Sequence, residues 1–250
     1  MTDPRASIDQ ADVDRFDRLG ERWWALDGPM KALHAFNPVR VAYLRDLLRD
    51  ELQGPDHPAH AAPLAGLSIL DIGCGAGILS EPLARLGATM TGIDPAPQNI
   101  EVAQRHAADM GLSIDYRAQT AEALQAQGET FDAVLAMEVV EHVRHPRAFL
   151  KVAGGLVRPG GVLAAATLNR TLKSYALAII GAEYVLGWVE RGTHQWEQFI
   201  TPDELRRAFR GAGVTPLDEA GVVYDLFRNS WKRSDDMDVN YMMAGRKRAV

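Results

Sequence analysis

The chain has 250 residues, a formal net charge of −6 and a single cysteine. This length suits one α/β domain with a sizeable core. The acidic balance argues against nucleic acid as a partner, because nucleic-acid-binding surfaces are usually basic. The lone Cys74 excludes internal disulfides and cysteine-based zinc clusters.

The N-terminus shows no signal pattern, and no run reaches the ~18 apolar residues of a membrane span. We therefore expect a single domain over residues 1–250 in the cytoplasm, with peripheral contact to a membrane as an alternative.

Residues 1–52 are predicted to form a helical extension before the first strand. Residues 13–24 have apolar side chains at helical spacing and end in the pair Trp23 and Trp24. Two interpretations of this pair are open, a helix packed on the main domain or a lid over an apolar substrate. A second helix is expected from an Asn37 N-cap to about Leu52.

Arg40 would lie on the first turn of that second helix. An arginine there is well suited to hold the carboxylate of a ligand in a bidentate pair.

The chain is organised around residues 68–77, which read S-I-L-D-I-G-C-G-A-G. A short apolar run predicts a buried strand, and glycines at alternate positions predict a tight turn into a helix. This unit brings backbone N–H groups and a helix N-terminus close to a ligand. Glycines that only make a tight turn are the simpler alternative.

The spacing of the glycines separates two nucleotide ligands. A dinucleotide fingerprint needs G-x-G-x-x-G, and Gly73 and Gly75 fit it, but position 78 is isoleucine. The observed D-x-G-x-G-x-G resembles the first motif of the Rossmann-like S-adenosylmethionine (SAM) methyltransferases. Asp94 ends the next predicted strand, where a doubly wound fold places a carboxylate on a ribose diol. A cap for the helix after Pro95 is the alternative role of Asp94.

Strands and helices alternate from this unit to Thr167, which predicts a parallel sheet covered by helices on both faces. The fold class is thus α/β, with a Rossmann-like, mostly parallel sheet of seven strands, N-terminal helices and an apolar insertion after the fifth strand. The strands expected in this part are residues 68–72, 88–94, 113–117, 131–137 and 162–167.

Met137 ends the fourth strand and is followed by Glu138, Glu141 and His142. Ligands in parallel sheets bind at the carboxyl ends of strands, and positions i, i+3 and i+4 share one face of a helical turn. Two carboxylates and an imidazole suit Mg²⁺, Mn²⁺ or Zn²⁺, and such an ion would lower the pKa of a bound phenol. Helix capping by the acids and packing of the histidine is the simpler alternative.

Residues 170–198 are the predicted insertion. Its centre, residues 176–189, is strongly apolar but too short to span a bilayer, and Lys173 and Arg191 flank it. A buried lid and an interfacial helix that touches lipid are both consistent with this pattern. After the insertion, Thr201 and Glu204 form an S/T-x-x-E capping box at the start of a further helix. Residues 214–225 and 239–245 are expected as closing strands.

Several motifs together resemble one family, the bacterial ubiquinone biosynthesis O-methyltransferases. The resemblance covers residues from about 16 to 242. Beyond the glycine motif it rests on motifs much narrower than the superfamily: R-W-W at 22–24, H-x-x-N-P-x-R at 34–40, M-E-V-V-E-H at 137–142, T-L-N-R at 167–170, G-A-E-Y at 181–184, G-T-H at 192–194 and D-V-N-Y-M at 238–242.

The resemblance implies methyl transfer from SAM to catechol-type hydroxyls of polyprenylated intermediates, a 2-polyprenyl-6-hydroxyphenol and demethylubiquinol. It implies SAM contacts from Arg40, Gly73, Asp94 and Met137. Glu138, Glu141 and His142 match the divalent-metal ligands of the family's mitochondrial members, with Mg²⁺ or a similar ion as the second cofactor. Its implied partners are the inner-membrane lipid surface and other enzymes of ubiquinone biosynthesis.

Two positions depart from the family pattern, Pro95–Pro97 after the second-strand acid and the charged loop at 227–236. They leave the preference for tail length open. His142 and His194 are both candidate catalytic bases, and a metal-bound substrate would need neither.

Three other functions remain as alternatives. The first is a methyltransferase of another small phenol. An NAD-dependent oxidoreductase is disfavoured by Ile78, and a non-catalytic SAM- or lipid-binding module is disfavoured by the polar cluster at 138–142.

Overall fold

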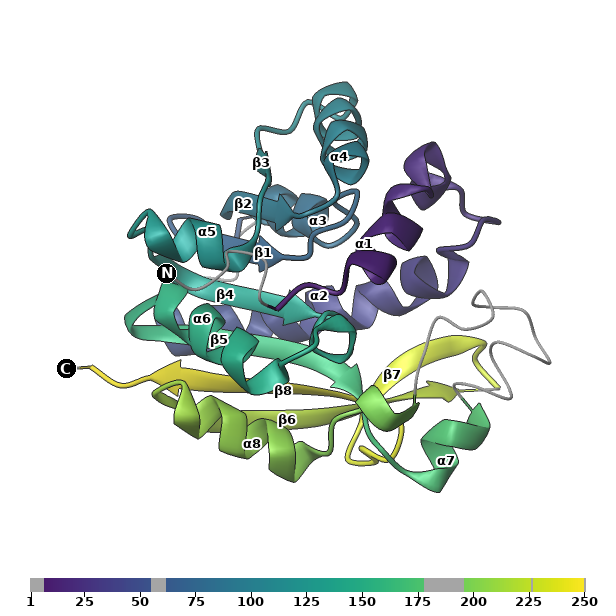
Figure 1. Cartoon of the computed structure of the whole chain (residues 1–250), viewed down its shortest axis with the longest axis vertical. Coiled ribbons are helices and arrows are strands. Elements are labelled where there is room, and N and C mark those ends of the chain that lie inside the picture. The colour runs from purple at the N-terminus through teal and green to yellow at the C-terminus, as the bar shows by residue number, and fades with distance from the viewer. Residues whose placement is uncertain (1–6, 55–61, 178–195, 226, 250) are drawn as a thin grey trace.

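The computed structural model describes residues 7–54, 62–177, 196–225 and 227–249. Within them, eight strands form one sheet in the order β3-β2-β1-β4-β5-β8-β6-β7 (Figure 1). The first five in that order are parallel, and the last three pair antiparallel. The strands are β1 Ser68–Ile72, β2 Thr89–Asp94, β3 Asp115–Ala118, β4 Phe131–Met137, β5 Val157–Leu168, β6 Val214–Asp225, β7 Ser230–Ser234 and β8 Asn240–Lys247.

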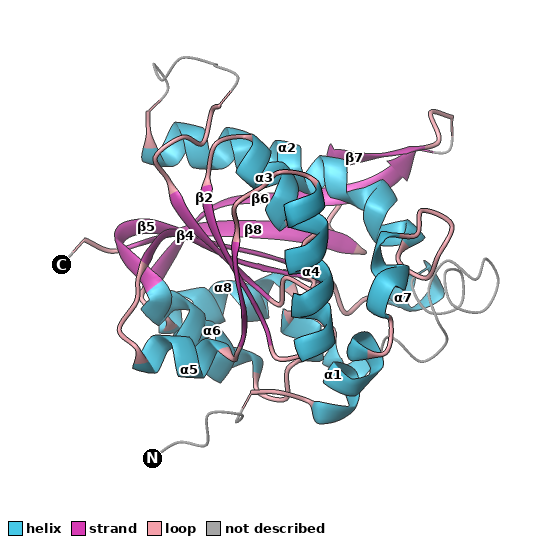
Figure 2. Ribbon diagram, turned by 90° about the horizontal axis from the view of Figure 1, so that it is seen from above, coloured by secondary structure: helices cyan, strands magenta, loops and turns pink. Residues whose placement is uncertain are grey.

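Helices cover both faces of this sheet (Figure 2). The α-helices are α1 Gln10–Asp17, α2 Lys31–Leu52, α3 Ser80–Arg85, α4 Pro97–Asp109, α5 Ala121–Ala126, α6 Pro146–Leu156, α7 Leu172–Ser174 and α8 Pro202–Gly211. Short 3₁₀ turns are η1 Gly20–Trp24, η2 Val140–His142 and η4 Trp196–Gln198. The α/β architecture predicted from the alternation of elements is confirmed.

The central strands are apolar throughout because both faces of the sheet are buried. Leu70 and Val134 pack with α5, α6 and α8 on one face. Their chain neighbours Ile69 and Leu135 point the other way, into a second core with α2 and α3. This alternation with a period of two residues leaves only the strand ends free to carry polar side chains.

The N-terminal extension differs from its prediction in two places. The expected helix over 13–24 is divided into α1 and η1 at Gly20, which has φ +49°. The second helix begins at Lys31 and continues through Pro38, so Asn37 is not its N-cap. The Asn37 side chain instead donates to the Ile78 carbonyl, at 2.8 Å. Burial of Phe36 against the core favours the extra turn although Pro38 removes one helical hydrogen bond.

The sheet has one strand more than the seven expected, because residues 230–234 of the predicted charged loop pair with β6 as β7. Of the insertion at 170–198, the structure describes residues 170–177 and 196–198; the apolar centre and His194 lie outside the described residues. Within the described parts of the chain, no helix combines the length and apolar character needed to cross a bilayer.

Candidate active site

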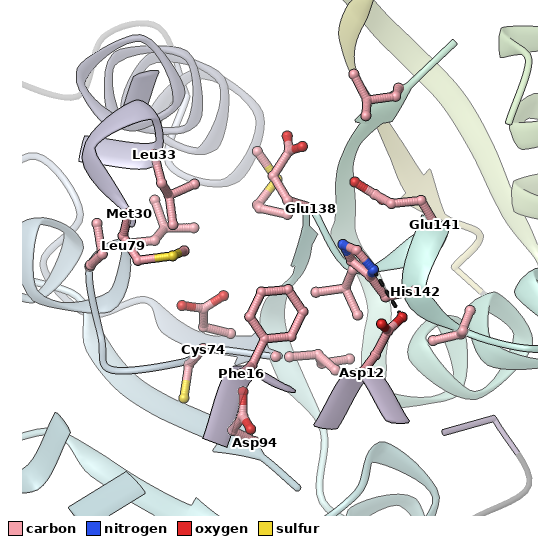
Figure 3. A pocket seen from close by; sticks show the side chains of 18 of the residues that line it. Asp12, Phe16, Met30, Leu33, Cys74, Leu79, Asp94, Glu138, Glu141 and His142 are labelled. Carbon is pink, nitrogen blue, oxygen red and sulfur yellow. Dashed lines mark hydrogen bonds and ion pairs between the residues drawn. The ribbon is translucent and has the colours of Figure 1, made fainter. Parts of the chain in front are cut away.

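A cavity of about 710 Å³ lies at the carboxyl ends of the parallel strands. This is within the range of ~300–1,000 Å³ typical of small-molecule sites. The ends of β1, β2 and β4 line it, and α1 and α2 close it from the N-terminal side. Figure 3 shows Asp94 at one end of the view and Glu138, Glu141 and His142 at the other, with Phe16 between them.

The turn after β1 follows the glycine pattern closely. Gly73, Gly75 and Gly77 have φ values of +70°, +53° and +89°, a region that favours glycine. A Cβ on Gly73 would lie 2.6 Å from Val139 Cγ2, and one on Gly75 would lie 2.6 Å from the Trp23 ring. The glycines therefore serve both the turn geometry and the close approach of two other segments.

Asp94 ends β2 beside this turn and is 8% exposed. Its carboxylate accepts from the backbone N–H of Gly75 at 3.0 Å and of Ala96 at 2.8 Å. Asp94 thus holds the turn that leads into α4, although it is not the N-cap of that helix, and it also lines the cavity. Burial raises its pKa to about 6, against the lowering effect of these hydrogen bonds.

Asp71 is a buried acid of the cavity that the sequence analysis treated only as part of the glycine motif. Its Oδ2 accepts from Ser80 Oγ at 2.7 Å, which joins the end of β1 to the start of α3. Burial raises its pKa to about 6, while Ser80 and the Arg40 charge act in the opposite direction.

Arg40 is 2% exposed and lines the same cavity. Its guanidinium donates to Asn37 Oδ1 at 2.9 Å and lies 5.3 Å from the centroid of the Phe36 ring. Burial lowers its pKa, and the charges of Glu138, Asp71 and Glu141 oppose that shift. Arg40 is thus a buried cation near three acids, Asp71 on β1 and Glu138 and Glu141 after β4.

Glu138 directly follows β4 and has φ +61°, which is rare for a residue with a side chain. The 3₁₀ turn begins only at Val140, so the three candidate metal ligands do not share one helical turn as expected. Glu141 Oε2 accepts from Thr167 Oγ1 at 2.8 Å. Burial, followed by repulsion from Glu141, raises the pKa of Glu138 to about 8.

His142 turns toward the N-terminal segment. Its Nδ1 lies 3.2 Å from Asp12 Oδ2, and its ring meets the Phe16 ring edge-on at 5.3 Å between centroids (Figure 3). Among the residues that the structure describes, no group of three or more histidine, cysteine, aspartate or glutamate side chains is arranged to hold a metal ion. Glu138, Glu141 and His142 all line the cavity, and the imidazole is paired there with Asp12.

The N-terminal tryptophans cover the glycine turn, so the packing interpretation holds for them. Trp23 Nε1 donates to Asn99 Oδ1 at 2.8 Å, and Trp24 Nε1 donates to the Ala76 carbonyl at 3.1 Å. Phe16 and Leu19, on the same segment, line the cavity itself. The segment therefore packs on the main domain and also closes the site.

Gln119 and Thr120 are cavity residues that sequence reasoning missed. They follow β3, the neighbour of β2 in the sheet. The order of the strands in the sheet places the loop after β3 beside Asp94. The sequence motifs give no such order, so they did not indicate Gln119 and Thr120.

Comparison with known proteins places the chain in a family. A family model described as a methyltransferase domain matches residues 40–219. A ubiquinone biosynthesis O-methyltransferase of Methylocella silvestris is 61% identical over 97% of this chain and 96% of the relative. That of Brucella ovis is 50% identical over 98% of both chains. The chain belongs to the ubiquinone biosynthesis O-methyltransferases. It is a SAM-dependent O-methyltransferase, as the sequence motifs predicted.

Solved structures share the fold of this O-methyltransferase. The magnesium protoporphyrin IX methyltransferase of Synechocystis, solved with bound S-adenosylhomocysteine (SAH), aligns with a TM-score of 0.66 at 19% identity, over 96% of this chain and all of that one. A SAM-dependent methyltransferase of Thermotoga maritima aligns with a TM-score of 0.62 at 18% identity, over 96% and 100% of the two chains. The Rossmann-like methyltransferase fold is confirmed.

Proposed function

We propose that this enzyme methylates catechol-type hydroxyls of polyprenylated intermediates in ubiquinone biosynthesis, a 2-polyprenyl-6-hydroxyphenol and 3-demethylubiquinol. The observation that carries the proposal is the identity of 50–61%, over nearly the whole chain, to relatives named for that pathway. The cavity suits the reaction, because the nucleoside-binding turn and a buried group of polar side chains lie at its two ends.

The cofactor is placed by three residues in this proposal. The Asp94 carboxylate accepts hydrogen bonds from the ribose hydroxyls. The backbone around Gly73 approaches the methionine portion of SAM. Arg40 pairs with the SAM carboxylate. Its guanidinium Nε has no hydrogen-bond partner among the described residues and is fully buried, which supports a ligand for it.

The strand order bears on which part of SAM Met137 contacts in this proposal. β1 separates β4 from β2, so Met137 is on the far side of the glycine turn from Asp94. We place Met137 beside the transferred methyl group and the loop of Gln119 beside the adenine. Gln119 Nε2 is buried and has no partner among the described residues, which leaves a donor for the base.

The reaction itself is an in-line displacement. The methyl carbon leaves the SAM sulfur and bonds to the catechol oxygen, the hydroxyl proton goes to a base, and SAH remains. The protein holds the two reactants in one cavity and excludes water from it. His142 is the candidate base, and Asp12 orients its ring through the contact at Nδ1.

A divalent cation, Mg²⁺ or a similar ion, is the finer part of the proposal. Glu138 Oε1 and Glu141 Oε1 are buried and lack hydrogen-bond partners among the described residues, and carboxylate oxygens suit a hard cation. These two acids fit such an ion, whereas the described residues do not bring His142 into a three-ligand group with them. When bound, the ion would lower the pKa of the catechol hydroxyl.

The test of this proposal is methyl transfer to a short-tail catechol with and without chelator. We expect O-methylation of the catechol and no transfer to the matched phenol that lacks the second hydroxyl. Equal turnover of both phenols would instead support a methyltransferase of another small phenol. Loss of activity with chelator and its return with Mg²⁺ are expected; full activity in excess chelator would remove the metal from the account.

Membrane contact is proposed for the region that begins at α7. Leu172 is 82% exposed and Leu177 54% exposed, and Lys173 lies between them in the chain. Large apolar side chains beside a cation suit the surface of an anionic membrane. An enzyme whose substrate carries an isoprenoid tail gains from resting there, peripheral to the inner membrane.

A further inference from the structure

The β6–β7 hairpin contains the strand that the sequence analysis did not expect, and one of its faces turns toward α2. Val222 pairs with Arg233 and Tyr224 pairs with Trp231, so these four side chains share a face. The Trp231 ring meets the ring of Phe36 on α2 at 5.4 Å and that of Tyr224 at 5.3 Å, both at 67° between planes. Three aromatic rings thus stand in a row from α2 to the hairpin.

This aromatic row belongs to the cavity already described. Phe36, Val222, Tyr224 and Trp231 line it together with Asp94 and Glu138. Phe36 joins the two parts, because both the Arg40 guanidinium, 5.3 Å from its centroid, and the Trp231 ring contact it. A polar reaction end and an apolar wall are therefore adjoining parts of one space.

We propose that Phe36, Val222, Tyr224 and Trp231 form a groove that holds the first isoprene units of the substrate's tail, and that Trp231 and Tyr224 set the preference for a tailed substrate. This rests on the proposed function. A catechol ring between SAM and the buried acids would direct its substituent past Phe36 and along the hairpin. Leu177 lies at the rim of the same cavity, and Phe227, fully exposed, lies at the turn between β6 and β7. The groove thus leads from the reaction end toward exposed apolar side chains.

The competing explanation is that the aromatic row only packs the hairpin on α2. The two explanations differ in what they predict for substrates of different length. A groove stabilises the tail, so each isoprene unit it covers should raise kcat/KM of the wild type by at least about tenfold, the gain from burying roughly two of its carbons. Packing alone gives no dependence on the tail.

The experiment measures kcat/KM in detergent-free buffer for catechols with no tail, one isoprene unit and two units. We expect Trp231→Ala and Tyr224→Ala to lose most of the gain per unit and to change turnover of the tail-less catechol by less than about threefold. Trp231→Phe, which keeps a ring, should retain most of the gain. Leu217→Ala is the matched control, since Leu217 is on β6 at 44% exposure and is not a cavity residue. SAM affinity measured on every variant verifies that the fold is intact.

Two results would overturn the groove. One is a wild type whose kcat/KM is the same for all three catechols. The other is a Trp231→Ala variant that binds SAM normally and loses the same factor on the tail-less and tailed substrates. Failure of the proposed function would give a different result, in which SAM binds but no catechol of any length is methylated. The groove would then have no isoprenoid tail to bind.

Discussion

Asp94 carries two tasks with one side chain. Its carboxylate holds the glycine turn and the start of α4 through Gly75 and Ala96, and in the proposed function it also accepts the ribose hydroxyls. A carboxylate buried among donors can do both, since each oxygen accepts more than one hydrogen bond. Substitutions at this position therefore have to separate loss of binding from loss of structure.

Asp94→Asn should weaken SAM binding by roughly 1.5–3 kcal/mol, the range for hydrogen bonds to a charged group. The amide oxygen can replace only one of the two carboxylate oxygens that accept from Gly75 N and Ala96 N, so the melting temperature should fall modestly. Asp94→Ala should show the same loss of affinity and also lower the free energy of unfolding by about 1–3 kcal/mol, because buried N–H groups lose their acceptor. Isothermal calorimetry and thermal melts measure the two effects, and unchanged SAM affinity in Asp94→Asn would remove this residue from the cofactor site.

The pKa of Asp94 gives a pH dependence with opposite signs for binding and stability. Burial raises it from 3.8 to about 6, so the folded protein takes up a proton that the unfolded chain does not hold between these values. The contribution of Asp94 to the free energy of unfolding should fall as pH rises from about 4 to about 6. SAM affinity should rise over the upper part of that range, because the ionised carboxylate accepts hydrogen bonds from the ribose hydroxyls. Calorimetry from pH 5 to 8 should show this rise in the wild type, and a similar rise in Asp94→Asn would assign it to another group.

At the scale of single elements, the residue patterns predicted the bounds of strands and helices where local preferences and burial agree. The strand at 131–137 has the predicted bounds because its apolar run from 133 to 137 is buried between two helical layers, and the buried Asp132 at its start is paired with Arg158. The predicted start of α2 was wrong. Asn37 and Pro38 would form a good helix N-terminus in isolation, but burial of Phe36 outweighs that preference. β7 was missed because Lys232 and Arg233 interrupt any apolar alternation, and its pairing with β6 comes from the backbone.

The capping box of α8 gives a stability prediction at this scale. Thr201 Oγ1 accepts from Glu204 N, and the Glu204 carboxylate accepts from Thr201 N. Thr201→Ala should lower the free energy of unfolding by about 1 kcal/mol. Methyl transfer should be unaffected, because none of the cavity-lining residues comes from α8. Urea unfolding measures the change in the free energy of unfolding, with Thr201→Ser as the conservative control. Loss of methyl transfer in a fully folded Thr201→Ala variant would show that α8 affects the active site.

At the scale of the whole molecule, the glycine turn and the acids after β2 and β4 could be assigned to one site from sequence because they end neighbouring strands. Contacts between distant segments could not be assigned in this way. His142 and Asp12 are 130 residues apart, and no local pattern indicates that they meet. The aromatic row from Phe36 to Trp231 likewise exists only once α2 and the hairpin are packed.

The membrane proposal is tested at this scale. Replacing Ile179, Ile180 and Leu186 with serine should reduce co-sedimentation with anionic liposomes and turnover of a long-tail substrate, while turnover of a short soluble analogue falls less. The matched control replaces the exposed apolar residues Leu26, Met110 and Leu217 with serine, at 72%, 52% and 44% exposure. Equal pelleting of the wild type and both triple variants would place membrane contact elsewhere.

The arrangement of SAM and catechol in one cavity is the central claim, and a crystal structure with SAH and a short-tail catechol analogue tests it most directly. The account predicts the ribose hydroxyls within about 3.2 Å of the Asp94 carboxylate. The SAH sulfur should face the end of the cavity where Glu138 and Glu141 lie, with the catechol ring between them and its substituent directed toward Trp231. A ribose bound away from Asp94, or a catechol bound outside this cavity, would contradict the account.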